Sequence, residues 1–226
     1  MPDRVLDRPI WSALTTVQAD LAEGGDGAKR FPADISPFIV ARDDSSESLA
    51  GMTELVADGD LVVLLQRTPS PVPPGFTLEK EAPGVQMVAE NLRSALASDE
   101  VVPLGDADAT AMLELATMTE PGPFLVNTHR LGGFLGIRQN GRLAAMAGER
   151  LKPGRYCEVS AVCTHPDYRG RGYAGLLTQM VAARIVRRGQ IPFLHTYASN
   201  ENAIRLYEKL GFRHRCDMTV QVLRRA

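Results

Sequence analysis

The stretch that most constrains this chain is residues 158–174, which read E-V-S-A-V-C-T-H-P-D-Y-R-G-R-G-Y-A. The apolar run Val159 to Cys163 predicts a buried strand, and His165-Pro166-Asp167 ends it. Arg169-Gly170-Arg171-Gly172 then leads into a helical pattern. Glycines between a strand and a helix N-terminus let backbone N–H groups approach an anion, and two arginines add charge-assisted donors suited to phosphate. The stretch therefore predicts a binding site for a phosphate-bearing cofactor.

The composition is that of an ordinary globular protein, and 226 residues suffice for one large domain or two small ones. A formal charge of -2 gives no reason to expect nucleic acid or an anionic membrane as partner. The three cysteines and four histidines lack the spacing of a disulfide framework or a metal site, so we expect no metal and a cytoplasmic location. No apolar run reaches about 18 residues, and the N-terminus lacks the pattern of a secretory signal.

The first hundred residues predict a small α/β unit without a visible chemical motif. Apolar spacing and turn residues predict, in order, a helix over 9–21, a short strand at 38–40, a capping turn at 43–46, a helix ending at Gly59, a buried strand at 61–65, a proline-rich loop at 68–75, a short strand at 85–88 and a weak helix at 91–97. A boundary near residue 98 separates this unit from the rest of the chain.

The second half predicts the order β-α-β-β-β-α-β-α-β, a mixed sheet with helices packed on it. Asn140-Gly141 is a strong hairpin signal, and Gly189 and Gly211 are typical helix ends. The expected strands are 101–104, 134–138, 143–147, 157–164, 192–197 and 218–223; the expected helices begin near residues 106–108, after Gly172, and at Asn200.

Two other phosphate sites fit the glycines poorly. Gly170-x-Gly172-x-x-Gly175 matches the dinucleotide-binding pattern, but five residues separate it from its strand, and the next strand ends without an acidic residue. A Walker loop is excluded because no Gly-Lys-Ser/Thr follows.

A third pattern fits better. Arg169-Gly170-Arg171-Gly172-Tyr173-Ala174 resembles the Arg/Gln-x-x-Gly-x-Gly/Ala signature of the GCN5-related N-acetyltransferase (GNAT) superfamily, and Asn200 to Phe212 resembles its second signature. The resemblance covers roughly residues 101–226, and the whole chain is similar to the FR47-like branch. It implies an α/β (α+β) fold whose mixed, mostly antiparallel central sheet is flanked by helices. Residues 99–226 would be the GNAT domain, and residues 1–98 an N-terminal α/β domain, for which a degenerate GNAT-like half is one interpretation.

The resemblance also implies where acetyl-CoA would bind. The pyrophosphate would lie on the glycine-rich turn, formed by Arg169, Gly170, Arg171, Gly172, Tyr173 and Ala174. The pantetheine arm would run along Ala161, Val162 and Cys163 and pair as an added strand does. Asn200 is expected either to contact this arm or to cap its helix, and one amide can serve both. Cys163 itself is expected to be inert packing.

Acetyl transfer to an amine requires removal of a proton, stabilisation of an oxyanion and protonation of a thiolate. Glu158 is the candidate base, eleven positions before Arg169, and we expect burial to raise its pKa; the alternative is a solvated acid at a strand end. Tyr207 is the candidate acid, with a core aromatic as the alternative. Backbone N–H groups of Val162 or Cys163 would polarise the thioester carbonyl. The histidines are weaker candidates. By family analogy, Glu120 and Phe124 would line the acceptor site.

The resulting hypothesis is an acetyl-CoA-dependent N-acetyltransferase that transfers the acetyl group directly to a primary amine of a small molecule, amino acid or peptide. The alternative is a non-catalytic module that binds acetyl-CoA for regulation or interaction. Partners are then acetyl-CoA and the acceptor, with no nucleic acid and no membrane. The acceptor, the length of the acyl group and the assembly state, with a homodimer among the options, stay open at this point.

Overall fold

The computed structural model describes residues 4–92 and 98–226. The predicted weak helix at 91–97 falls mostly on residues outside these ranges. Strands from both halves of the sequence join one eight-stranded sheet in the order β4-β11-β5-β10-β9-β8-β7-β6. Its strands are β4 (Leu61–Gln66), β5 (Phe76–Ala89), β6 (Val101–Leu104), β7 (Phe134–Gln139), β8 (Arg142–Glu149), β9 (Tyr156–Thr164), β10 (Ile191–Tyr197) and β11 (Phe212–Arg225). Apart from the parallel pair β9–β10, the neighbours among these strands are antiparallel, so the predicted mixed, mostly antiparallel sheet is confirmed.

The predicted order of the second half is confirmed, with α3 (Ala109–Thr119), α4 (Tyr173–Arg187) and α5 (Glu201–Leu210) between the strands. Helices α3 and α4 cover opposite faces of the sheet. Neighbouring residues of β8 point to these two faces in turn. Ala145 packs in the cluster of α4, whereas Met146 packs in the cluster of α3. This two-sided burial gives β8 and β9 their nearly continuous apolar sequences.

The N-terminal half is a small layer built on β4. It contains α1 (Pro9–Leu14), α2 (Ser46–Glu54) and a three-stranded sheet of β1 (Glu23–Gly24), β2 (Ala28–Arg30) and β3 (Ile39–Ala41). The predicted capping turn is confirmed, since the Ser45 side chain accepts a hydrogen bond from the Ser48 N–H at 3.3 Å. The predicted helix at 9–21 is too long: α1 ends at Leu14, and a short 3-10 turn follows at Ala19–Leu21.

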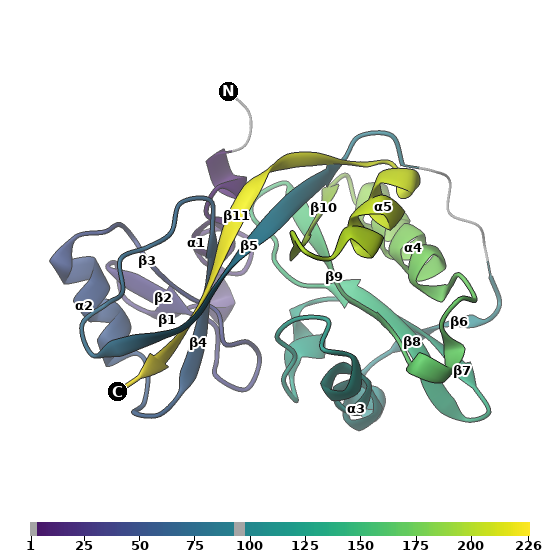
Figure 1. Ribbon diagram of the computed structural model, residues 1–226, viewed down its shortest axis with the longest axis horizontal. Helices are drawn as coiled ribbons and strands as arrows, with labels where there is room; N and C mark the ends of the chain where they lie inside the picture. Colours follow the sequence, from purple (N-terminus) through teal and green to yellow (C-terminus); the bar gives the residue numbers. More distant parts are fainter. Residues whose placement is uncertain (1–3, 93–97) are drawn as a thin grey trace.

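A long ribbon of β5 and β11 joins the two halves (Figure 1). One end of β11 pairs with β4, and one end of β5 pairs with β10. Both strands are longer than predicted, at 14 residues each. Residues 77–81 of β5 are exposed and, apart from Leu78, polar, so they lack the apolar pattern that reveals a strand. The boundary at residue 98 remains a prediction. None of the helices in the described ranges has the length and apolar character needed to cross a membrane.

Gly211, which ends α5, provides a test of this packing. It has φ of 100°, and a Cβ built there would lie 1.9 Å from the Asn91 carbonyl oxygen. Gly189 after α4 has φ of 73° but open space around it. We expect Gly211→Ala to lower the free energy of unfolding by more than ~2 kcal/mol, against ~1 kcal/mol for the control Gly189→Ala. Urea denaturation measures both, and equal losses would contradict the crowding at Gly211.

Candidate active site

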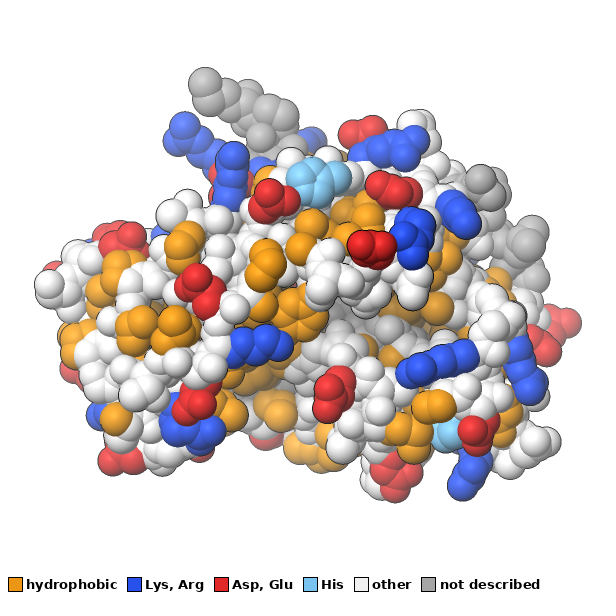
Figure 2. Space-filling model, in the orientation of Figure 1, with side chains coloured by type: hydrophobic (Ala, Val, Ile, Leu, Met, Phe, Trp, Pro, Cys, Tyr) orange, Lys and Arg blue, Asp and Glu red, His pale blue; other side chains and the backbone are white. Residues whose placement is uncertain are grey.

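A pocket lies where β9 and β10 separate, between the two halves of the molecule. The two strands pair only as far as Phe193 and Glu158. Beyond that point, residues 159–162 of β9 and 195–197 of β10 line the cavity, whose volume is about 170 Å³. The same cavity is lined by Phe38, Val63, Leu65, Gly84, Glu120, Pro121, Gly122, Pro123, Arg150, Asn200, Tyr207, Val220 and Val222. In Figure 2, hydrophobic side chains gather around the hollow in the middle of the face shown.

Two of the pocket-lining residues have backbone conformations that are unfavourable for residues other than glycine. Ala161 has φ of 52° and lies within a bulge of β9, where the register against β8 shifts. Glu120 has φ of 48° and ends α3. The remaining non-glycine residue with positive φ among those described is Asn140, in the hairpin turn. Such strain persists only where the surrounding structure maintains it, and it is common at functional sites.

Glu158 forms a buried ion pair with Arg150 behind the pocket wall. Arg150 donates from Nε to Oε2 at 2.9 Å and from Nη2 to Oε1 at 2.7 Å, and the Leu151 N–H also donates to Oε2 at 3.3 Å. The Glu158 side chain is fully buried and does not line the cavity. The expectation that the pKa of Glu158 is raised is wrong. Burial does disfavour the carboxylate, but the guanidinium of Arg150 and the hydrogen bond from His195 outweigh it and hold the pKa of Glu158 at about 2.

His195 connects this ion pair to the N-terminal half. Its Nδ1 lies 2.7 Å from Glu158 Oε1, and its Nε2 lies 2.8 Å from Gln86 Nε2. Gln86 also donates from Nε2 to the Leu6 carbonyl and accepts at Oε1 from Arg215, both at 2.9 Å. These contacts assign the proton of His195 to Nδ1, which donates to Glu158, and leave Nε2 as an acceptor. Both ring nitrogens are thus engaged within the protein.

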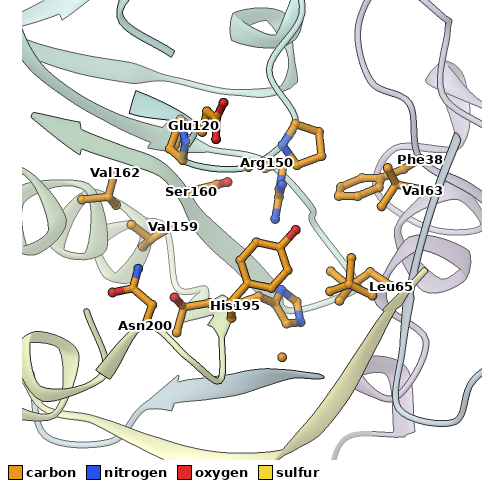
Figure 3. Close-up of a pocket in the computed structure, with 18 of the residues that line it drawn as sticks. Phe38, Val63, Leu65, Glu120, Arg150, Val159, Ser160, Val162, His195 and Asn200 are labelled. Carbon is orange, nitrogen blue, oxygen red and sulfur yellow. The ribbon is translucent and has the colours of Figure 1, made fainter. Parts of the chain in front are cut away.

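The two predicted residues of the second signature do line the pocket. Asn200 caps α5 by accepting from the Ala203 N–H at 3.2 Å, and its side chain is at the edge of the cavity (Figure 3). Tyr207 lines the cavity and packs edge-on against Phe212. Burial, with a smaller contribution from Cys163, raises the pKa of Tyr207 to about 12, so its phenol keeps its proton at neutral pH.

The residues predicted for cofactor binding fall into three groups. Ala161 and Val162 line the cavity. Cys163 points instead into the core beneath α3, where burial raises the pKa of its thiol to about 11, as expected for a packing residue. The glycine-rich turn of residues 169–174 lies outside the cavity, between the end of β9 and α4.

The turn itself has an open and conformationally demanding backbone. Gly170 and Gly172 both have φ of 79°, and a Cβ on either would meet no atom within 4 Å. Gly172 is the N-cap of α4, whose first N–H groups receive no side-chain cap. These features fit an anion site formed by main-chain donors and the helix dipole.

Several pocket residues were not predicted from the sequence. Arg150 lies over the ring of Phe38, with its guanidinium carbon 4.8 Å from the ring centroid. Phe38, Val63 and Leu65 come from the N-terminal half and were treated there as ordinary apolar residues. Glu120 was expected at the acceptor site and lines the cavity, whereas Phe124 packs edge-on against Phe134 in the core. A charged residue directly after an apolar strand, as Arg150 is after β8, was the available signal.

Comparisons with known proteins agree with this geometry. The family model described as FR47-like protein matches residues 134–222. The structure of a GNAT-family protein from Novosphingobium aromaticivorans is 42% identical, covers 99% of this chain and 100% of its own, and superposes with a TM-score of 0.92. A GCN5-related N-acetyltransferase from Kribbella flavida has the same fold at 17% identity, with coverage of 99% and 96% and a TM-score of 0.64. Among curated proteins, none matches the sequence significantly.

The chain belongs to the GNAT family of acetyltransferases, and the resemblance stated from its two signatures is confirmed. Membership favours acetyl transfer over the non-catalytic alternative.

Removing the charge of Glu158 tests the ion pair. We expect Glu158→Gln to lower the free energy of unfolding at pH 7 by about 3–5 kcal/mol, because it leaves Arg150 buried without its counterion. The folded-state pKa of about 2 lies below the unfolded value of about 4.3, so this stability is present above pH ~4.3 and is lost as the pH falls through 2.

The difference between wild type and variant should therefore shrink as the pH is lowered from 5 toward 2. Urea denaturation across this range measures it, with exposed Glu208→Gln on α5 as control. A difference that stays constant or grows on acidification would contradict the ion pair.

Proposed function

We propose that this protein is an acetyl-CoA-dependent N-acetyltransferase that transfers the acetyl group directly to a primary amine. The observation that carries the proposal is the separation of β9 from β10 directly above the buried Arg150–Glu158 pair. This opening lets an extended ligand pair with β9, whose far end continues into the glycine-rich turn. The strand and the turn that follows it would then position the thioester and the pyrophosphate of the cosubstrate.

Acetyl-CoA would bind along β9 in the direction of the chain. Its thioester would lie at the bulge around Ala161 and Val162, and its pantetheine arm would continue past Asn200. The pyrophosphate would accept hydrogen bonds from the backbone of residues 169–174. Arg169 and Arg171 supply positive charge there, and Arg171 is held over the Tyr168 ring with its guanidinium carbon 5.1 Å from the centroid.

In the reaction, the amine nitrogen attacks the thioester carbonyl carbon, so that a C–N bond forms and the C–S bond breaks. A backbone N–H of Val162 or Cys163 stabilises the oxyanion. The departing CoA thiolate takes a proton from Tyr207, whose phenol lines the same cavity and is re-protonated from solvent.

The proton of the acceptor ammonium does not go to Glu158, because that carboxylate is buried, ionised through Arg150 and saturated with hydrogen bonds. Glu158 instead orients Arg150 and His195. Glu120 is the carboxylate that lines the cavity, and it attracts the ammonium and passes its proton to solvent. A cytoplasmic location, consistent with the three free cysteines, is part of the same proposal.

Tyr207→Phe tests the acid. We expect kcat to fall about 10- to 100-fold, because the thiolate leaves without a proton donor, while the dissociation constant for acetyl-CoA stays within about twofold. Calorimetric titration gives the binding constant, and CoA release with a panel of amines gives the rate. Tyr156→Phe, a core tyrosine outside the pocket, is the control. Absence of acetyl-CoA binding at millimolar concentration would refute the function, whereas normal turnover of Tyr207→Phe would remove only the role of Tyr207.

A further inference from the structure

The orientation of Arg150 leaves one of its nitrogens available to a ligand. Glu158 engages Nε and Nη2, while Nη1 has no hydrogen-bond partner within the described ranges. Nη1 lies next to Gly122, which also lines the cavity: a Cβ built on this glycine would lie 3.9 Å from Nη1. The arginine side chain is only 10% exposed. A nearly buried guanidinium nitrogen that lacks a hydrogen-bond partner at a cavity wall favours an acceptor group on the ligand, and a carboxylate oxygen is the strongest such acceptor.

The charged groups of the cavity are complementary to a zwitterion. Of the pocket-lining residues, Arg150 carries the positive charge and Glu120 the negative charge. In Figure 3 Glu120, Arg150 and Ser160 appear together in the upper part of the view, and Gly122, two residues after Glu120, lies next to Nη1 of Arg150. An acceptor whose ammonium lies near Glu120 and the β9 bulge can therefore place a neighbouring carboxylate at Arg150.

The remaining wall is apolar and comes from the N-terminal half and β11. Val63 pairs with Val222 and Leu65 with Val220 across β4 and β11, so that these four side chains share one face. Phe38 completes this wall beside Arg150 (Figure 3). The surface would desolvate an aliphatic or aromatic side chain and offers no partner for a second charge.

The size of the cavity limits the acceptor. About 170 Å³ is small compared with the roughly 300–1,000 Å³ of sites for drug-sized ligands. A lysine side chain of a protein would bring no carboxylate to Arg150, and a peptide N-terminus would place a neutral amide there.

We propose that the acceptor is a free α-amino acid with an apolar side chain, whose carboxylate binds Arg150, whose amine lies near Glu120, and whose side chain packs on Phe38, Val63, Leu65, Val220 and Val222. This inference rests on the proposed acetyltransferase function and specifies its substrate class.

Matched acceptors test this assignment on the wild-type protein. L-leucine is compared with leucinamide, which replaces the carboxylate by a neutral amide, with 3-methylbutylamine, which lacks it, and with the dipeptide Leu-Gly. We expect kcat/KM for leucine to exceed that for each of the other three by about 10- to 100-fold, the usual effect of a hydrogen bond to a charged group. This preference is diagnostic because the amine of leucinamide is less basic than that of leucine and loses its proton more readily. The reactivity of the amine alone would therefore favour the amide.

Alanine and glutamate test the apolar wall, and both should react at least about tenfold more slowly than leucine. Arg150→Lys keeps the charge beside Glu158 but loses the fork, and it should reduce the ratio of leucine to 3-methylbutylamine by at least about fivefold. Equal or better turnover of the amide, the amine or the dipeptide by the wild-type protein would overturn the substrate class while leaving acetyl transfer intact. If no CoA is released with these acceptors or with the panel of amines, the proposed function itself is overturned.

Discussion

The buried ion pair between Arg150 and Glu158 is the interaction on which the rest of the site depends. Removing both charges from water is costly, and the attraction offsets that cost only when the remaining hydrogen-bonding groups are satisfied. Two guanidinium nitrogens, the Leu151 N–H and His195 satisfy the Glu158 carboxylate here. The pair fixes Arg150 at the pocket wall and forms just below the point where β9 and β10 separate.

The N-terminal half supports this arrangement from the other side. Gln18 donates from Nε2 to the Arg150 carbonyl and accepts at Oε1 from the Lys152 N–H, both at 2.9 Å. Gln86 links His195 to the carbonyl of Leu6. Phe38 covers the guanidinium. The loop that carries Arg150 is therefore held by residues distant in sequence, and the half without a recognisable motif both completes the pocket and immobilises its cation.

How much the sequence reveals depends on how local each signal is. The strand, the glycine-rich turn and α4 are contiguous, so their pattern predicts the fold of the second half and the two signatures. The exposed parts of β5 and β11 have no such pattern, because pairing between the two strands, and not burial in a hydrophobic core, keeps them extended. The apolar wall was missed because it depends on pairing between β4 and β11, which are distant in sequence. Arg150 was missed because the sequence does not show which side chain it contacts.

The expectation for Glu158 shows this limit most clearly. Burial alone raises the pKa of a carboxyl group, and the sequence does not reveal that Arg150, eight residues earlier, folds back as its counterion. The most direct test is a ¹³C NMR titration of the Glu158 carboxyl, assigned by its loss in Glu158→Gln. We expect this carboxyl to stay ionised down to a pH of about 2 or to acid unfolding, whichever comes first. A titration midpoint above pH 5 in the folded protein would contradict it and would restore Glu158 as the candidate base.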